Sequence, residues 1–129
     1  MIIQAGVIIT VNVFFGDRVH ININSTIGHD CKIGDFVTIG PGSNIRGRNI
    51  VKNEIYIGSS VVTKEKIAIG NNSIIGVGTV VITDIPEESI FVGVPGKVKR
   101  NYEMEFIKYL LFPKKIKFTQ TRILLFIRE

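Results

Sequence analysis

Large apolar residues recur at a strict spacing of six along most of the chain. Stepping by six from Ile3 to Val81 gives fourteen positions, and all of them except Thr63 are large and apolar. A second column lies four residues later in each hexad and is apolar or small throughout, except at Asn49. Gly directly follows the first column in seven hexads, and the remaining positions carry most of the Asp, Asn, Lys and Arg.

A six-residue period fits neither an α-helix, with its period of 3.6, nor a simple strand, with its period of two. A short strand followed by a sharp turn does keep this period, because Gly allows the bend and β-branched Ile fills the interior. Three such strands make a coil of 18 residues, so the fourteen hexads predict about four and two-thirds coils of an all-β solenoid. A β-sandwich is the weaker interpretation, because its turns recur at irregular spacings of about 8–12 residues.

The repeat fades after Val81, where we predict a last extended segment over residues 89–94. Apolar residues at i,i+4 spacing over residues 102–111 predict a short helix that ends before Pro113 and covers the open end of the solenoid. Residues 114–118 and 123–127 are interpreted as two short strands or a tail. We therefore divide the chain into a β-helix domain at 1–96 and a basic C-terminal helix and tail at 97–129.

Charge and composition narrow the functional classes. The 129 residues carry a net charge of +5, but residues 1–96 hold 7 basic and 8 acidic side chains, whereas residues 97–129 hold 9 and 3. The repeat is thus nearly neutral, and we expect no nucleic-acid partner. A single cysteine, Cys31, excludes an internal disulfide framework and favours a reducing, cytoplasmic location. Residues 1–16 lack charge before Asp17 but match neither a signal peptide nor a membrane span.

His29 is the first candidate for catalysis. It follows the inward-facing Ile27 by two residues, so we expect its side chain to point away from the core at or near a corner. Imidazole is suited to general-base catalysis near neutral pH, although a solvated turn histidine is the alternative. Asp30 is a candidate for orienting the imidazole, or a turn-forming Asp. Cys31 falls in the inward column and is interpreted as a core residue rather than a nucleophile.

Four stretches resemble the hexapeptide-repeat acyltransferases, whose fold is a left-handed parallel β-helix. They are residues 21–22, 28–37 (Gly-His-Asp-Cys-Lys-Ile-Gly-Asp-Phe-Val), 39–42 and 91–97 (Phe-Val-Gly-Val-Pro-Gly-Lys). Within that family the sequence is most similar to the sialic acid O-acetyltransferase and bacillosamine N-acetyltransferase group. The resemblance implies a homotrimer that transfers an acetyl group from acetyl-CoA to an amino or hydroxyl group of a sugar or nucleotide sugar, with each site between two subunits.

The same resemblance implies roles for individual residues. His29 would deprotonate the acceptor, Asp30 would orient His29, and the Gly47 N–H, eighteen residues after His29, would stabilise the oxyanion. Asn22, seven residues before His29 and on the preceding coil, would line the acceptor pocket. The residues expected along the acetyl-CoA groove are Thr38, Gly47, Ser59, Val77 and Lys97.

The chain also departs from the family pattern. The usual N-terminal sugar-binding subdomain has no counterpart before the repeat, Thr38 stands where a second His is common, residues 64–66 replace a Leu-Pro-Gly turn, and the basic tail is unfamiliar. These departures favour an alternative function, a truncated, non-catalytic β-helix that serves as an oligomerisation scaffold. The zinc-dependent γ-class carbonic anhydrases share the fold but need three His ligands. Because the chain has only His20 and His29, we expect no metal.

Overall fold

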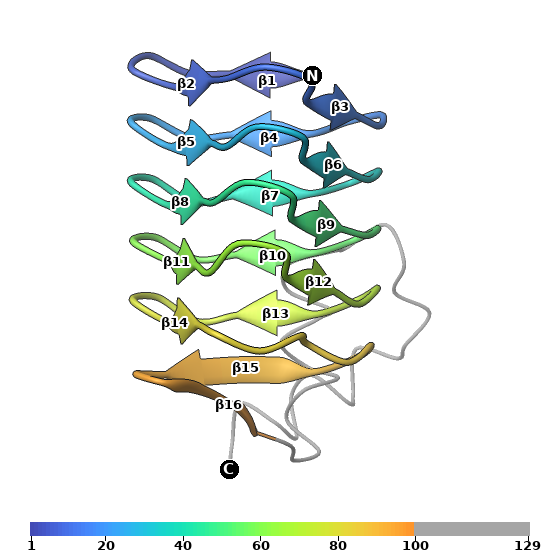
Figure 1. Ribbon diagram of the computed structural model, residues 1–129, viewed down its shortest axis with the longest axis vertical. Coiled ribbons are helices and arrows are strands. Elements are labelled where there is room, and N and C mark those ends of the chain that lie inside the picture. Colours follow the sequence, from blue (N-terminus) through green and yellow to red (C-terminus); the bar gives the residue numbers. More distant parts are fainter. Residues whose placement is uncertain (100–129) are drawn as a thin grey trace, which may run out of the picture. The chain divides into compact units, whose positions relative to one another are not determined.

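A computed structural model describes residues 1–99, which wind into a three-sided parallel β-helix (Figure 1). Successive coils are in register at a spacing of 18 residues, since Ile3 pairs with Ile21 and Ile21 pairs with Ile39. The predicted 18-residue coil is therefore confirmed. The predicted C-terminal helix and the segments 114–118 and 123–127 lie outside the described residues. Within residues 1–99 no helix is long and apolar enough to cross a membrane.

Each coil contributes one two-residue strand to each of three faces, which we call A, B and C. Face A contains β1 (Ile2–Ile3), β4 (His20–Ile21), β7 (Thr38–Ile39), β10 (Tyr56–Ile57) and β13 (Ile74–Ile75), followed by β15 (Ile90–Gly93) and β16 (Gly96–Lys99). Face B contains β2 (Ile8–Ile9), β5 (Thr26–Ile27), β8 (Asn44–Ile45), β11 (Val62–Thr63) and β14 (Val80–Val81). Face C contains β3 (Phe14–Phe15), β6 (Lys32–Ile33), β9 (Ile50–Val51) and β12 (Ala68–Ile69).

The core lies inside the prism and is formed by the two apolar columns of the repeat. Both columns are buried from Val19 to Ile85, whereas Ile3 in the first coil is 46% exposed because no coil precedes it in the structure. Cys31 is fully buried and its Sγ–H donates to the Arg46 carbonyl oxygen at 3.1 Å. The interpretation of Cys31 as a core residue is therefore confirmed.

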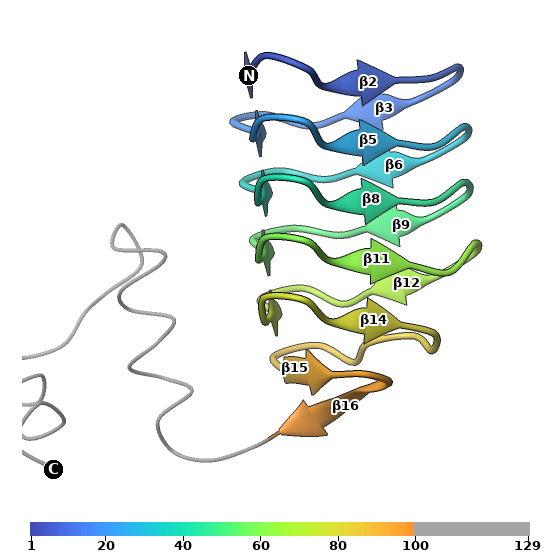
Figure 2. The same ribbon diagram turned by 90° about the vertical axis from the view of Figure 1, so that its left-hand side faces the viewer.

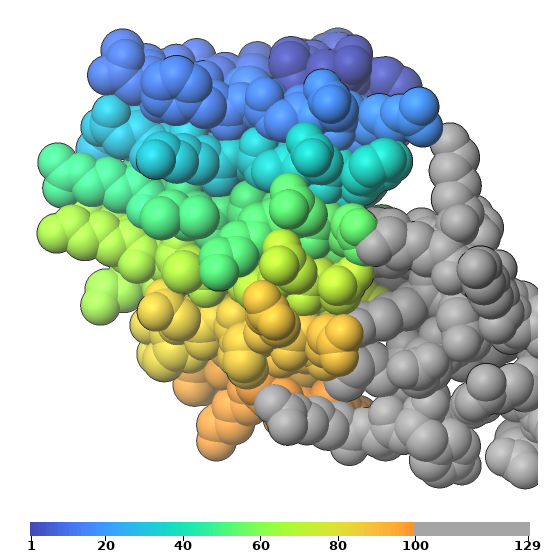
Figure 3. Space-filling model, turned by 90° about the vertical axis from the view of Figure 1, so that its right-hand side faces the viewer, coloured from blue at the N-terminus to red at the C-terminus, as the bar shows by residue number. Residues whose placement is uncertain are grey.

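Three-residue corners connect the faces and stack on one another from coil to coil. Corner AB comprises residues 4–6, 22–24, 40–42, 58–60 and 76–78; corner BC comprises 10–12, 28–30, 46–48 and 64–66; corner CA comprises 16–18, 34–36, 52–54 and 70–72. The third residue of each of these corners has a positive φ, and most of these residues are not glycine. Most of these third corner residues are exposed to solvent. Figure 3 shows the coils as stacked layers from the N-terminal coil to the closing strands.

The described β-helix ends in an antiparallel hairpin on face A (Figure 2). The predicted extended segment at 89–94 corresponds to β15, which pairs with β13. The second strand of the hairpin, β16, pairs with β15 from Gly93↔Gly96 to Ile90↔Lys99 and was not predicted. The strand β16 continues to Lys99, the last residue that the structure describes, and the predicted domain boundary at residue 96 stays a prediction.

Candidate active site

His29 and Asp30 form a hydrogen-bonded pair at corner BC. His29 Nδ1 lies 2.8 Å from Asp30 Oδ2, and the two side chains are 43% and 45% exposed. Asp30 has a φ of 59°, a left-handed conformation that Asp tolerates better than most residues. The corner therefore presents both side chains outward, as the sequence predicts for His29.

The carboxyl group of Asp30 is held in its charged form. The hydrogen bond with His29 lowers the pKa of Asp30 below its usual value of 3.8, a hydrogen bond with the Asn12 side chain lowers it further, and the positive charge of Arg48 adds to the effect. An ionised carboxylate can only accept hydrogen bonds, so His29 Nδ1 must be the donor. In the neutral imidazole this tautomer leaves Nε2 unprotonated and able to accept a proton.

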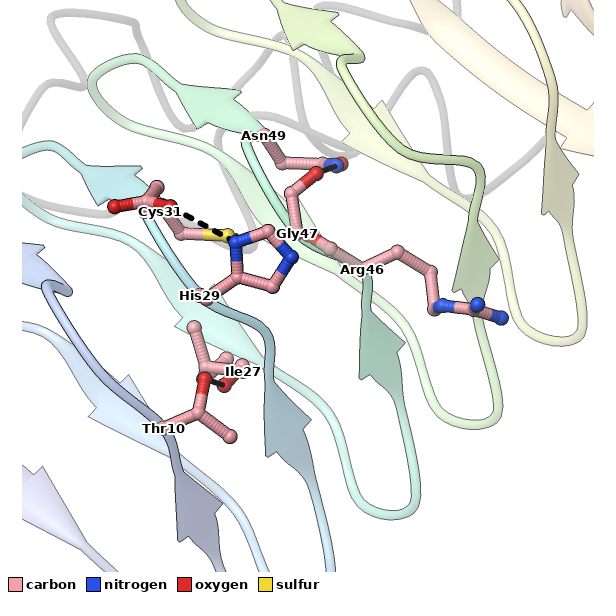
Figure 4. A network of polar contacts seen from close by, with 8 residues as sticks. Thr10, Ile27, His29, Cys31, Arg46, Gly47 and Asn49 are labelled. Carbon is pink, nitrogen blue, oxygen red and sulfur yellow. Dashed lines mark hydrogen bonds and ion pairs between the residues drawn. The ribbon is translucent and has the colours of Figure 1, made fainter.

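Gly47 lies against that nitrogen, one coil further along corner BC (Figure 4). A Cβ atom added at Gly47 would lie 2.6 Å from His29 Nε2 and 2.9 Å from both Cδ2 and Cε1. Real Cβ atoms do not approach other atoms this closely, so the imidazole occupies this position only because residue 47 is glycine. The structure thus brings His29, Asp30 and Gly47 together at one corner.

The backbone at corner BC differs from that at corner CA. At corner CA the N–H of Asp17 donates to Asp35 Oδ1 at 2.7 Å, and the N–H of Asp35 donates to Asn53 Oδ1 at 2.8 Å. Each coil there supplies a side-chain acceptor for the coil before it. At corner BC, by contrast, the Gly47 N–H has no hydrogen-bond partner within the described residues.

Asn22 is not where the sequence analysis placed it. It lies at corner AB of the same coil as His29, not on the preceding coil, because β5 alone separates the two corners. Its Nδ2 donates to the Ile39 carbonyl oxygen at 3.0 Å. Within a single chain the structure therefore gives no contact between Asn22 and the His29–Asp30 pair.

The residues predicted to bind acetyl-CoA are divided between different parts of the prism. Gly47 is at corner BC, whereas Thr38 lies on face A in β7. Ser59 and Val77 stack one coil apart at corner AB, where Val77 is 76% exposed. Lys97 is exposed in β16. A single chain therefore does not bring the predicted groove together.

Two residues that the sequence analysis did not single out contribute to the site. Asn12 and Arg48 occupy the same corner position as Asp30, one coil before it and one coil after it, and both act on its carboxylate. The signal was present in the sequence, because both residues lie eighteen positions from Asp30. The coil length that places Gly47 next to His29 also places these two side chains next to Asp30.

The other potentially reactive groups near the corner do not form a competing site. Burial raises the pKa of the Cys31 thiol, which is already engaged with the Arg46 carbonyl oxygen. A buried thiol with a raised pKa is a poor nucleophile. Within the part of the chain that the structure describes, no three His, Cys, Asp or Glu side chains are placed to hold a metal ion together.

Stability at low pH tests the charged state of Asp30. Because the pKa of Asp30 is lower in the folded protein than its usual value of 3.8, its contribution to stability is complete above that value and is lost as the pH falls through the folded pKa. We expect the difference in melting temperature between the wild-type protein and Asp30→Asn to be largest above pH ~4 and to shrink below it. Melting curves of both proteins between pH ~6 and pH ~2.5 measure this; a difference that grows on acidification would contradict it.

Comparisons with known proteins show similarity to acetyltransferases of the hexapeptide-repeat type. Residues 12–47 match the family described as "Bacterial transferase hexapeptide (six repeats)". The chain is 42% identical over 64 residues to the GDP-perosamine N-acetyltransferase of Escherichia coli O157:H7, a match that covers 50% of this chain and 29% of that protein. It is 33% identical over 109 residues to the galactoside O-acetyltransferase of Escherichia coli K12, which covers 69% of this chain and 54% of that protein.

The described fold is also found among solved structures. PerB from Caulobacter crescentus, crystallised in complex with CoA and GDP-perosamine, superposes with a TM-score of 0.61 at 26% identity, over 74% of this chain and 55% of PerB. The prediction of an all-β, left-handed parallel β-helix is confirmed for residues 1–99. The chain spans 29% and 54% of the lengths of the two curated relatives.

Proposed function

We propose that this chain, a hexapeptide-repeat β-helix related to sugar acetyltransferases, transfers an acetyl group from acetyl-CoA to an amino or hydroxyl group of a sugar or nucleotide sugar. The observation that carries the proposal is the His29–Asp30 pair at corner BC, with the glycine backbone of the next coil against the imidazole. Both curated relatives are named as acetyltransferases that act on sugar compounds, and PerB was crystallised with CoA and a nucleotide sugar.

The proposed chemistry is direct transfer with His29 as the general base. Asp30 holds the Nδ1–H, and Nε2 removes the proton from the acceptor hydroxyl or amine as its oxygen or nitrogen attacks the thioester carbonyl carbon. The negative charge that develops on the carbonyl oxygen is stabilised by the free N–H of Gly47. When the tetrahedral intermediate collapses, the carbon–sulfur bond breaks and the CoA thiolate receives the proton from Nε2.

The distribution of the remaining predicted residues supports a homotrimer. Ser59 and Val77 lie at corner AB and Gly47 at corner BC, so one prism cannot line a single groove with all three. Cyclic packing would place corner AB of one subunit beside corner BC of the next, and would complete the site from two subunits. Thr38 and Lys97 would then extend the acetyl-CoA groove along the neighbouring subunit. A molar mass of three chains in solution tests this assembly, and a monomer with full activity would contradict it.

Acetyl-CoA turnover tests the function. We expect release of free CoA thiol that depends on the acceptor, measured on a panel of amino and hydroxy sugars and their nucleotide derivatives. An N-acetylated product would indicate an amino acceptor, and an O-acetylated product a hydroxyl acceptor. A folded protein that fails to bind acetyl-CoA would instead favour the non-catalytic oligomerisation scaffold. Spontaneous thioester hydrolysis without acceptor provides the background rate.

A further inference from the structure

Thr63 in the first column and Asn49 in the second column both depart from the pattern of the repeat, and both lie beside the same corner. Thr63 is the only polar residue of the first column, and Asn49 is the only large polar residue of the second. Both are buried, with at most 1% of their surface exposed. Both also form hydrogen bonds with the segment that carries Gly47.

Asn49 forms one hydrogen bond that is usual for its column and one that is not. Its Nδ2 donates to the Lys64 carbonyl oxygen at 2.9 Å, fifteen residues on, as Ser43 donates to the Gly58 carbonyl oxygen at 2.8 Å. Asn49 also reaches back to the Gly47 carbonyl oxygen at 3.2 Å. From residue 7 to residue 85 no other member of this column donates to the carbonyl two residues before it, and Ser89, which corresponds to Ser73 in the last coil, makes a contact of this kind with the Glu87 carbonyl oxygen at 3.3 Å. The longer amide side chain therefore adds a tether to Gly47.

Thr63 changes the backbone ladder directly before Gly47. At the preceding coil the Gly28 N–H donates to the Ile45 carbonyl oxygen, seventeen residues on, at 2.7 Å. The Arg46 N–H instead donates to Thr63 Oγ1 at 2.9 Å. The pairing between β8 and β11 accordingly retains only Asn44↔Val62, whereas β5 and β8 are paired at both residues. At the first residue of the corner, Thr63 Oγ1 thus replaces the backbone carbonyl oxygen that accepts this hydrogen bond in the preceding coil.

These bonds hold both peptide groups that flank the Gly47 Cα. The Gly47 carbonyl accepts from Asn49 and from the Lys66 N–H at 3.1 Å, while the Arg48 N–H of the same peptide donates to the His29 carbonyl oxygen at 2.8 Å. On the other side the Arg46 carbonyl accepts from Cys31. Because C=O and N–H point in opposite directions in a trans peptide, this bond directs the Gly47 N–H away from the core. Glycine lacks the steric restriction of a Cβ, so the tethers supply the rigidity that residue 47 itself does not.

We propose that Asn49 and Thr63 are positioning residues that fix the Gly47 corner against His29 for acetyl transfer. This inference rests on the proposed function. Stability alone does not favour Asn49, because its Oδ1 is buried and has no hydrogen-bond partner in the structure. An apolar residue at either position would match the other members of its column. The two polar side chains therefore depart from the pattern of the repeat where the proposed chemistry requires a fixed backbone.

Two substitutions separate positioning from folding. Asn49→Ser retains a donor of the kind that Ser43 uses for the carbonyl fifteen residues on, and removes the bond to Gly47. Thr63→Val retains the side-chain shape and removes the acceptor for the Arg46 N–H. We expect each variant to lower kcat by roughly tenfold or more, because small displacements of catalytic groups have large effects on rate. The KM for acetyl-CoA should change by less than about twofold. The melting temperature of Asn49→Ser should stay the same or rise, because the unpaired Oδ1 is removed, whereas Thr63→Val should lose some melting temperature because the Arg46 N–H loses its acceptor.

Ser73→Ala is the matched control. Ser73 is a fully buried member of the same column that donates to the Gly70 and Pro86 carbonyl oxygens, away from corner BC. We expect this variant to lose melting temperature and to keep the wild-type kcat. A purely structural role for Asn49 and Thr63 predicts the same behaviour for their variants, and an unchanged kcat in Asn49→Ser and Thr63→Val would overturn the proposal.

Amide hydrogen exchange provides a readout that does not depend on activity. We expect the Arg48 amide to exchange faster in Asn49→Ser than in the wild-type protein, because the peptide that it shares with the Gly47 carbonyl loses a tether. If wild-type protein turns over no acceptor, the proposed function fails while the exchange of Arg48 still tests the tether. An unchanged Arg48 exchange rate would then overturn the positioning role by itself.

Discussion

Replacing His29 by alanine is expected to lower the kcat of acetyl transfer by about 10²–10⁴-fold, the usual contribution of a general base. The imidazole is the group at corner BC that can remove the acceptor proton, because Asp30 is bound to Nδ1 and Nε2 remains free. His29 is not part of the core, so the β-helix should fold as before. Thiol release at saturating acetyl-CoA and acceptor measures kcat, and melting curves measure the fold.

Two further variants identify the cause of this loss. His29→Gln retains a polar side chain that cannot act as a base near neutral pH, so it should lose as much activity as His29→Ala. Lys32→Ala removes an exposed side chain from the outer surface of β6, three residues further on, and should retain the wild-type kcat. A His29→Ala variant with wild-type turnover would contradict the proposed mechanism, because it would show that His29 is not the general base.

The fold was predictable from the sequence because the environment of each side chain depends on its position within the hexad. Ile27 and Ile45 both lie in the first column, and the structure pairs them on face B as neighbours from adjacent coils. The closing hairpin could not be predicted in this way, because the spacing between coils changes there. Ile75 pairs with Phe91, sixteen residues on, and β16 then turns back antiparallel to β15. A periodic pattern carries no information beyond the point at which its period ends.

The arrangement of the candidate site can be predicted from the sequence only where it follows from the 18-residue spacing between coils. Gly47 was placed beside His29 because eighteen residues separate them, which is one full coil. Asn22 was misplaced because seven residues amount to one hexad and one residue, which leads to the adjacent corner of the same coil. The bond between Asn12 and Asp30 also follows the 18-residue rule, but it depends on side-chain conformations that the sequence pattern does not determine.

Gly47→Ala is expected to lower kcat by about 10²-fold through displacement of the His29 imidazole. The added Cβ would lie 2.6 Å from Nε2, and the ring is the nearest group that can move. A displaced ring loses its hydrogen bond with Asp30, which both orients the base and fixes its tautomer. The substitution leaves the Gly47 N–H in place, so the loss reports on the imidazole rather than on the oxyanion donor. The kcat and the melting temperature are measured as for His29→Ala.

A double-mutant cycle between positions 29 and 47 distinguishes this steric effect from a general requirement for glycine at the corner. The three atoms nearest to the Cβ of an alanine at position 47 would all belong to the His29 ring. In the His29→Ala background the ring is absent, so Gly47→Ala should lower the melting temperature less than it does in the wild-type protein and should cause little further loss of kcat. Equal losses of melting temperature in both backgrounds would show that the backbone itself requires glycine. Because the two substitutions remove the same arrangement, their effects on rate should be strongly non-additive.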